Sequence, residues 1–257
     1  MKILNSNEYI NEKLAISPVT RTTLADYGKK PNVDDATKAF IEYHNLKWNP
    51  FTKSYDCDKS IKITNNDCVV DDGKFTIKFG NVKGNFYCDN LNLESLEGAP
   101  QKVEGNFYCG NNKLTSLEYA PQYVGGKFVC RYITLESLEG APKEVGDCFD
   151  CNKCNLKSLE GAPNIVGGSF HCGCNELTTL NGAPQEVGGD FIGNQNALVS
   201  LKGAPKKIDG NFDCSYNNLT SLDGAPEYVG EDFYCSCNPN LVLPKKKPSW
   251  VKGKIID

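Results

Sequence analysis

The sequence predicts a mainly β protein: a solenoid of eight units of about 21 residues, with a parallel sheet on one face, a non-helical return path and a small helical N-terminal segment. Three observations predict it. A phenylalanine recurs every 21 residues without insertion or deletion, a leucine follows ten residues after each one, and Pro and Gly fill the stretch between units. The phenylalanines are Phe86, Phe107, Phe128, Phe149, Phe170, Phe191, Phe212 and Phe233.

Other columns repeat with the same period. Cysteine stands two residues after the Phe in seven of the eight units, and Gly193 is the exception. These cysteines are Cys88, Cys109, Cys130, Cys151, Cys172, Cys214 and Cys235. Asparagine stands five residues after the Phe in Asn112, Asn175, Asn196, Asn217 and Asn238. An Ala-Pro pair follows in seven units, and Val or Ile comes three residues after each of those prolines.

Each column has a physical reading. Phe-x-Cys has the period-two pattern of a short strand with one buried face. The Asn side chain can satisfy backbone groups where the chain turns. Gly-Ala-Pro and Val-Gly-Gly do not continue a helix, because Pro lacks a donor and Gly loses too much backbone entropy. One unit cannot bury its apolar residues alone, so the units must stack.

The stretch Phe107-Tyr-Cys109-Gly-Asn-Asn112-Lys-Leu114-Thr-Ser-Leu117 resembles the core of a leucine-rich repeat, with Phe and Cys in place of the first two leucines. The short unit is similar to the bacterial subtype, and the fuller pattern LTSLEGAPxxVGGxFYC resembles repeat proteins encoded by tailed bacteriophages. The resemblance covers roughly residues 60–250. The resemblance implies a right-handed solenoid that binds a partner. It implies no particular reaction, because members of the family bind varied partners and share no common chemistry. It also implies a location in the cytoplasm of an infected bacterial host, or in the virion. The Asn column is interrupted by Leu91, Ile133 and Cys154.

Residues 1–50 form the N-terminal segment, for which we expect one or two short helices. Asn32 or Asp34 can cap a helix running to about residue 46, with Ala36, Phe40 and Tyr43 on one face. Residues 6–14 are a candidate for a second helix. The segment is either a plain N-terminal cap or a docking or sorting peptide.

Caps are expected at both ends of the repeats, because a solenoid needs polar outer surfaces there. Residues 51–84 are a degenerate capping unit, in which Ile61 indicates a strand and Val82 a return path. The repeats occupy residues 85–243. Residues 244–257 form a C-terminal cap and basic tail, in which Trp250 falls in the slot that Val or Ile holds elsewhere.

Composition and the absence of known motifs argue against several classes of function. The 257 residues carry a net charge of −4, which argues against a nucleic-acid partner, and no apolar run is long enough to span a membrane. Two histidines and the absence of a P-loop, a Gly-x-Ser-x-Gly elbow or an HExxH motif argue against an enzyme. No export signal is evident, so we expect a reducing compartment and free thiols.

The thirteen cysteines allow two interpretations. Those in the repeat column should point into the core and act as small hydrophobes, so we predict no metal and no cofactor. The alternative is a metal or redox site in Cys148-x-x-Cys151-x-x-Cys154 with Cys172-x-Cys174. Cys148 is an odd step from Cys151 and should face the opposite side of its strand.

The residues that flank each Phe, and the residue after each Cys, should project from the outer face of the sheet. They vary from unit to unit while the core columns hardly change, and aromatic residues and Arg are typical anchors of interfaces. We therefore predict a non-enzymatic protein-binding module that uses this face, of open oligomeric state. It would occlude a host protein or, alternatively, serve as a virion or assembly component. The predicted partner-binding residues are Tyr87, Tyr108, Val129, Arg131, Asp150, His171, Ile192, Asp213 and Tyr234.

Overall fold

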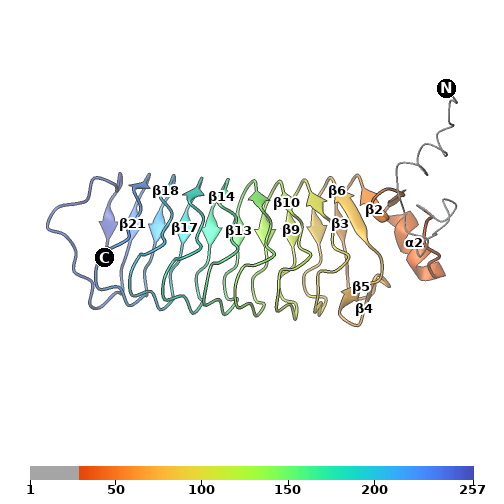
Figure 1. Ribbon diagram of the computed structural model, residues 1–257, viewed down its shortest axis with the longest axis horizontal. Helices are drawn as coiled ribbons and strands as arrows, with labels where there is room; N and C mark the ends of the chain where they lie inside the picture. The colour runs from red at the N-terminus through yellow and green to blue at the C-terminus, as the bar shows by residue number, and fades with distance from the viewer. Residues whose placement is uncertain (1–28) are drawn as a thin grey trace, which may run out of the picture.

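The computed structural model describes residues 29–257 and shows coils of about 21 residues stacked along one axis (Figure 1). The predicted mainly β solenoid with a non-helical return path is confirmed. The helix expected at residues 6–14 lies outside the described residues.

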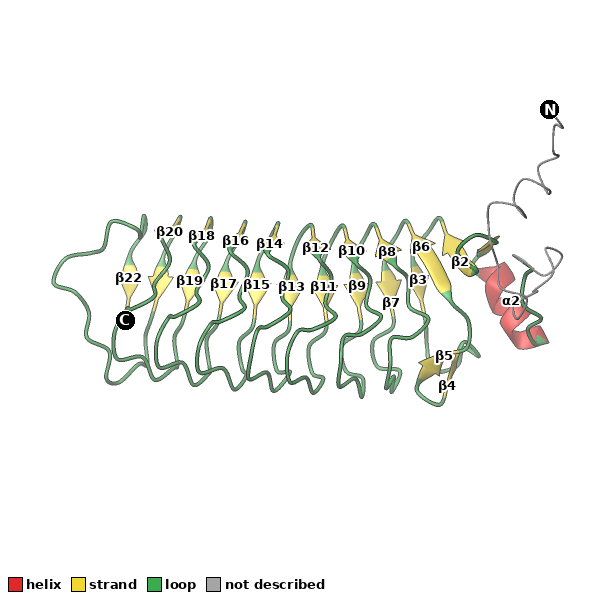
Figure 2. Ribbon diagram, viewed as in Figure 1, coloured by secondary structure: helices red, strands yellow, loops and turns green. Residues whose placement is uncertain are grey.

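The eight strands that begin with the repeat Phe, with one further strand at each end, form a ten-stranded parallel sheet, which we call the Phe sheet (Figure 2). Its strands, in spatial order, are β3 (Ile61–Lys62), β7 (Phe86–Tyr87), β9 (Phe107–Tyr108), β11 (Phe128–Val129), β13 (Phe149–Asp150), β15 (Phe170–His171), β17 (Phe191–Ile192), β19 (Phe212–Asp213), β21 (Phe233–Tyr234) and β22 (Ile255–Ile256).

The return path forms a second ten-stranded sheet, which the sequence did not predict; we call it the Val sheet. Its strands, in spatial order, are β1 (Lys47–Asn49), β2 (Ser54–Cys57), β6 (Phe79–Val82), β8 (Lys102–Val103), β10 (Tyr123–Val124), β12 (Glu144–Val145), β14 (Ile165–Val166), β16 (Glu186–Val187), β18 (Lys207–Ile208) and β20 (Tyr228–Val229). All pairs in it are parallel except β1 with β2. A small antiparallel hairpin, β4 (Val70–Asp71) with β5 (Lys74–Phe75), forms a separate two-stranded sheet.

The register places like residues above one another. Phe107 pairs with Phe128, and the Phe107 N–H donates to the Lys127 carbonyl at 2.7 Å. The phenylalanine rings therefore form a continuous buried column, with neighbouring centroids 5.1–5.6 Å apart. Edge-on rings end the column on both sides: Phe79 against Phe86 at 73° and Trp250 against Phe233 at 82°. An edge-to-face ring suits the ends because its positive edge meets the negative face of the last ring.

Glycine is required where coils approach closely. A Cβ on Gly146 would lie 2.2 Å from the Gly125 carbonyl oxygen of the preceding coil. Gly140 has a φ of +86°, and its copies in the other units are also left-handed glycines, except that Tyr119 occupies the slot with a φ of +67°. Only glycine adopts this conformation without steric cost.

The Asn column works as a ladder of side-chain amides. The Asn217 Nδ2 donates to the carbonyls of Gly193, Cys214 and Ser215 at 3.0–3.2 Å, and its Oδ1 accepts from the Leu198 N–H at 2.9 Å. The ladder is interrupted in three units, as expected. In one of them the Cys154 Sγ donates to the Cys130 carbonyl at 3.2 Å, a bond of the kind that the amide makes elsewhere.

The N-terminal cap contains α2 (Asp35–Tyr43), whose N-cap Asp34 accepts from the Thr37 N–H at 2.8 Å. The helix is confirmed, and of the three residues expected on one face only Phe40 is buried. Ala36 and Tyr43 are exposed, whereas Thr37, Phe40 and Ile41 are buried. The buried stripe therefore includes Phe40 as expected but continues through Thr37 and Ile41 instead of Ala36 and Tyr43, and Phe40 and Ile41 join the core.

At the other end, Val251 rather than Trp250 fills the Val slot, because Val251 forms the bridge to Val229. Trp250 lies one residue earlier and is half-buried against Phe233. The basic tail is folded as well, since β22 continues the Phe sheet beyond β21. The predicted strand at Ile61 is confirmed as β3, and Val82 ends β6.

Candidate binding face

Eight of the nine predicted partner-binding residues are the second residues of the Phe-sheet strands β7 to β21, so they lie side by side in register. Each follows a fully buried Phe and precedes a buried Cys or Gly193. They therefore belong to the outer surface of the Phe sheet, as the period-two pattern predicts.

A groove of about 630 Å³ lies on the N-terminal part of this surface. It brings together four of the predicted residues, Tyr87, Tyr108, Val129 and Arg131. The other residues that line it are Lys62, Asp89, Gly110 and Asn111. The predicted residues Asp150, His171, Ile192, Asp213 and Tyr234 lie on the same surface but do not line the groove.

Two tyrosines, Tyr87 and Tyr108, line the groove side by side. Their rings stack face to face, with centroids 4.9 Å apart and an angle of 4° between planes. The Asn85 Nδ2 donates to the Tyr87 hydroxyl at 2.9 Å and so orients it. Each ring therefore covers one face of the other.

Two predicted residues are more buried than expected. Val129 is 7% exposed and Asp150 is 6% exposed. The Arg131 guanidinium lies over Asp150, with 3.7 Å between Nη1 and Oδ2, and the Asn152 N–H donates to Asp150 Oδ1 at 3.1 Å. Asp213 accepts from the Ser215 N–H in the same way at 2.9 Å. These carboxylates therefore stabilise the strand ends.

The variable column before each Phe has a structural role that the sequence did not reveal. The Asn85 Oδ1 accepts from the Asn106 N–H at 2.8 Å, and the Asn106 Oδ1 accepts from the Lys127 N–H at 2.7 Å. The same bond recurs from Ser169, Asp190, Asn211 and Asp232 to the next coil. Any short acceptor serves here, so the variation among Asn, Asp and Ser in this column is explained without a partner, whereas among the described residues no such bond is made by Lys127 or Cys148.

Sequence reasoning missed Lys62, Asp89, Gly110 and Asn111. Asp89 and Gly110 stand in the column after Cys, which the sequence did place on this face. The sequence gives no such signal for Lys62. Its neighbour Ile61 pairs with Phe86, which is 25 residues away, so the 21-residue period does not predict the position of Lys62.

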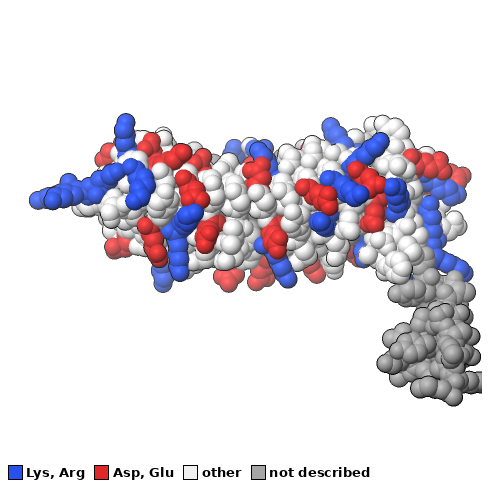
Figure 3. Space-filling model, turned by 90° about the horizontal axis from the view of Figure 1, so that it is seen from above, with Lys and Arg blue, Asp and Glu red and all other residues white. Residues whose placement is uncertain are grey.

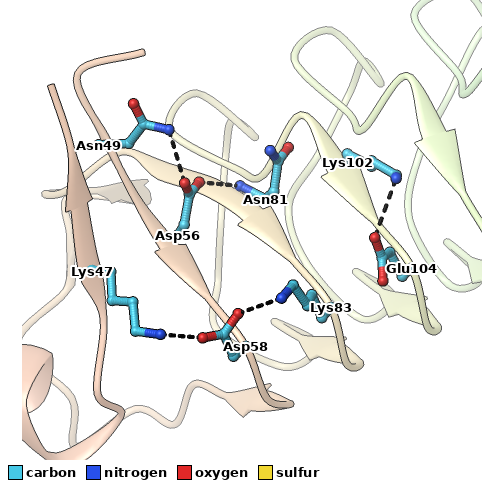
Figure 4. Close-up of polar contacts among 8 residues, drawn as sticks. All are labelled: Lys47, Asn49, Asp56, Asp58, Asn81, Lys83, Lys102 and Glu104. Atoms are coloured by element: carbon cyan, nitrogen blue, oxygen red, sulfur yellow. Dashed lines mark hydrogen bonds and ion pairs between the residues drawn. The ribbon is translucent and has the colours of Figure 1, made fainter. Parts of the chain in front are cut away.

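A second groove, of about 490 Å³, lies on the Val sheet near the N-terminal cap, and its charges satisfy one another (Figure 4). Asp58 lies between Lys47 and Lys83, and the Lys83 Nζ is 2.8 Å from its Oδ1. Hydrogen bonds from both ammonium groups lower the pKa of Asp58 to about 2. Asp56 accepts from the Asn49 side chain and from the Asn81 N–H. These ion pairs and hydrogen bonds connect the N-terminal cap to the first coils.

Charges of both signs are interspersed along the face shown in Figure 3, and basic side chains project at the end opposite the grey residues. Lys245, Lys246 and Lys247 are exposed there. On this face the basic side chains form no continuous band.

The column cysteines are buried, as predicted, and all thirteen cysteines are free thiols. Burial raises the pKa of Cys88, Cys151, Cys172 and Cys214 above the usual range. Cys148 is half-buried on the opposite side of its strand, where burial and the nearby Asp150 raise its pKa to about 11.

The cysteine cluster proposed for metal is divided by the strand. Cys151 and Cys172 point into the core, whereas Cys148 lies on the outer side. Within residues 29–257, no group of three or more His, Cys, Asp or Glu side chains is placed to hold a metal ion.

Comparison with protein-family models, with curated proteins and with solved structures finds no match to this chain. Within the described part of the chain, no helix has the length and apolar character needed to cross a membrane.

Proposed function

We propose that the protein is a non-enzymatic binding module that holds a protein partner on the outer surface of the Phe sheet and in the groove on its N-terminal part. One observation carries the proposal: four residues chosen from their variation between units line one groove. They include two tyrosines and an arginine, residue types that are enriched among interface hot spots.

The test uses the full-length chain as bait in an extract of its native host, followed by mass spectrometry. Tyr108→Ala should retain the fold, since the ring lies outside the core, and should weaken partner binding by about 2 kcal/mol or more. Tyr123→Ala is the matched control, because Tyr123 is an exposed tyrosine of the Val sheet. The proposal fails if both variants bind normally, or if changes beside the Ala-Pro turns abolish binding instead.

The resemblance to phage repeat proteins supports a further part of the proposal, that the partner is a host protein which the module occludes. Such an inhibitor is dispensable in purified particles and captures one host factor. Detection of the chain in purified particles at constant stoichiometry would favour the virion or assembly role. Stoichiometric zinc or a reversible disulfide in the purified protein would favour the metal or redox alternative.

A further inference from the structure

The groove on the Phe sheet has a row of polar groups that crosses four adjacent strands. Lys62 on β3 is in register with Tyr87 on β7, then with Tyr108 on β9 and Val129 on β11. Arg131 follows Val129 on the same side of the chain and also lines the groove. The row therefore begins and ends with a cation and has two phenols between.

These groups are donors without a hydrogen-bonded acceptor among the described residues, although Arg131 forms a long ion pair with Asp150. Among residues 29–257, no acceptor meets the Lys62 ammonium or the Tyr108 hydroxyl within hydrogen-bonding distance. The Tyr87 oxygen already accepts from Asn85, so its own hydrogen is free to be donated. The contact from Arg131 to Asp150 is 3.7 Å, too long for a hydrogen bond, and the Arg131 side chain is 49% exposed. The groove on the Val sheet differs, because its lysines at positions 47 and 83 both bind Asp58.

We propose that the groove binds an extended acidic segment of the protein partner, with one carboxylate at Lys62 and another at Arg131. This inference rests on the proposed function and names the chemistry of the partner. The row of donors complements an anionic, acceptor-rich chain, and charge-assisted hydrogen bonds to carboxylates are the strongest of this kind.

The spacing defines the segment further. Three steps of about 4.8 Å between strands separate β3 from β11, so the two cations lie roughly 14 Å apart along the solenoid axis. In an extended peptide, residues four apart project from the same face at roughly 13 Å. Two acidic residues at positions i and i+4 therefore match the row.

Asp89 restricts the middle of the segment. Its carboxylate lines the groove between the two cations and is held by the Asn90 side chain at 2.5 Å. A third carboxylate at position i+2 would meet this like charge. The chemistry thus favours a peptide with acidic ends and a neutral centre over a uniformly anionic chain.

The experiment measures binding of a fluorescent peptide to the full-length protein by anisotropy. The probe is a short Thr- and Val-rich peptide with two glutamates four residues apart. Replacing both glutamates by glutamine should weaken binding by about tenfold or more, as should raising the salt from about 0.05 M to about 0.5 M. A third glutamate midway should also weaken binding.

The double variant Lys62→Gln/Arg131→Gln should lose the same affinity for the glutamate peptide, by about tenfold or more. Lys143→Gln/Lys206→Gln removes two exposed lysines near the Val sheet and should bind as the unaltered protein does. Lack of saturable binding, equal binding of the glutamine peptide, or tighter binding of a heparin oligosaccharide would overturn the inference.

The captured partner separates this inference from the proposed function. If Tyr108→Ala abolishes capture while Lys62→Gln/Arg131→Gln and added salt leave it unchanged, the face is correct and the acidic segment is wrong. If none of these changes affects capture, both are wrong.

Discussion

The inner surface of the Phe sheet repeats nearly the same residues in every coil, whereas its outer surface changes from coil to coil. On the inside, the stacked rings contact their copies in the adjacent coils and the column thiols are buried beside them, so a residue of another size would leave a cavity or a clash. On the outside no such constraint acts. The column before each Phe nevertheless shows that variation alone does not identify a binding site, because Asn, Asp and Ser there all accept the same backbone hydrogen bond.

The largest difference between the two surfaces should appear at alkaline pH. The pKa of all seven column thiols is raised above the ordinary value of 9.0, by burial in six of them and in Cys130 by the hydrogen bond with Cys154 and then by burial. The unfolded chain loses these protons first, so the stabilisation is complete below about pH 9 and is lost as the pH rises through the folded-state values. Each thiol contributes about 1.4 kcal/mol per pH unit, so the urea midpoint should fall steeply above about pH 9.

Two variants serve as controls for this alkaline transition. Cys172→Ala should make the fall less steep, because one buried thiol no longer ionises on unfolding. Cys237→Ser should leave the profile unchanged, since Cys237 is exposed. A flat profile up to about pH 10.5 would contradict the buried register of the column.

Phe107 and Tyr108 separate the two surfaces one residue apart. Phe107→Ala opens a cavity in the ring column and should reduce the free energy of unfolding by about 3–5 kcal/mol. Tyr108→Ala removes only the stacking with Tyr87 and should cost about 1 kcal/mol. Chemical denaturation measures both. Equal losses would mean that the inner and outer surfaces have been assigned wrongly.

The amide ladder is tested by Asn217→Ala. The substitution leaves buried backbone carbonyls of two coils without a donor and should destabilise the protein by roughly 2–3 kcal/mol. Asn218→Ala, at the exposed neighbouring position, should change the free energy of unfolding by less than about 0.5 kcal/mol. A tolerated Asn217→Ala would show that solvent can satisfy the turn.

The smallest expected effect is a gain in stability. Tyr119 holds a left-handed conformation where the other units have glycine, so Tyr119→Gly should stabilise the protein by about 0.5–1 kcal/mol. Tyr119→Ala keeps the backbone cost and removes the ring, so it should give no gain. If both variants lose stability equally, contacts of the ring outweigh the backbone strain.

Much of the fold could be predicted because the same residue pattern recurs in eight units. The Phe and Cys columns predicted the Phe sheet and its buried side, and the prolines and glycines predicted a non-helical return path. The second sheet was not predicted, because two-residue strands such as Glu144–Val145 are too short to carry a period-two pattern. The sequence placed Trp250 at the Val position of the last coil, but Val251 occupies it, because this coil is one residue longer than the 21-residue repeat.

The candidate site also has features that the sequence determined and features that only the tertiary structure determined. The sequence by itself determined the length of the unit, the buried columns and the outward direction of Tyr87, Tyr108 and Arg131, since these follow from local periodicity. Only the tertiary structure decided that Lys62 joins them, that Asp150 is covered by Arg131, and that the column before Phe accepts backbone hydrogen bonds. The physical reason is that these properties depend on the side chain that lies beside each residue in the adjacent coil, which local periodicity does not specify. For Lys62, the irregular first coil also breaks the 21-residue spacing.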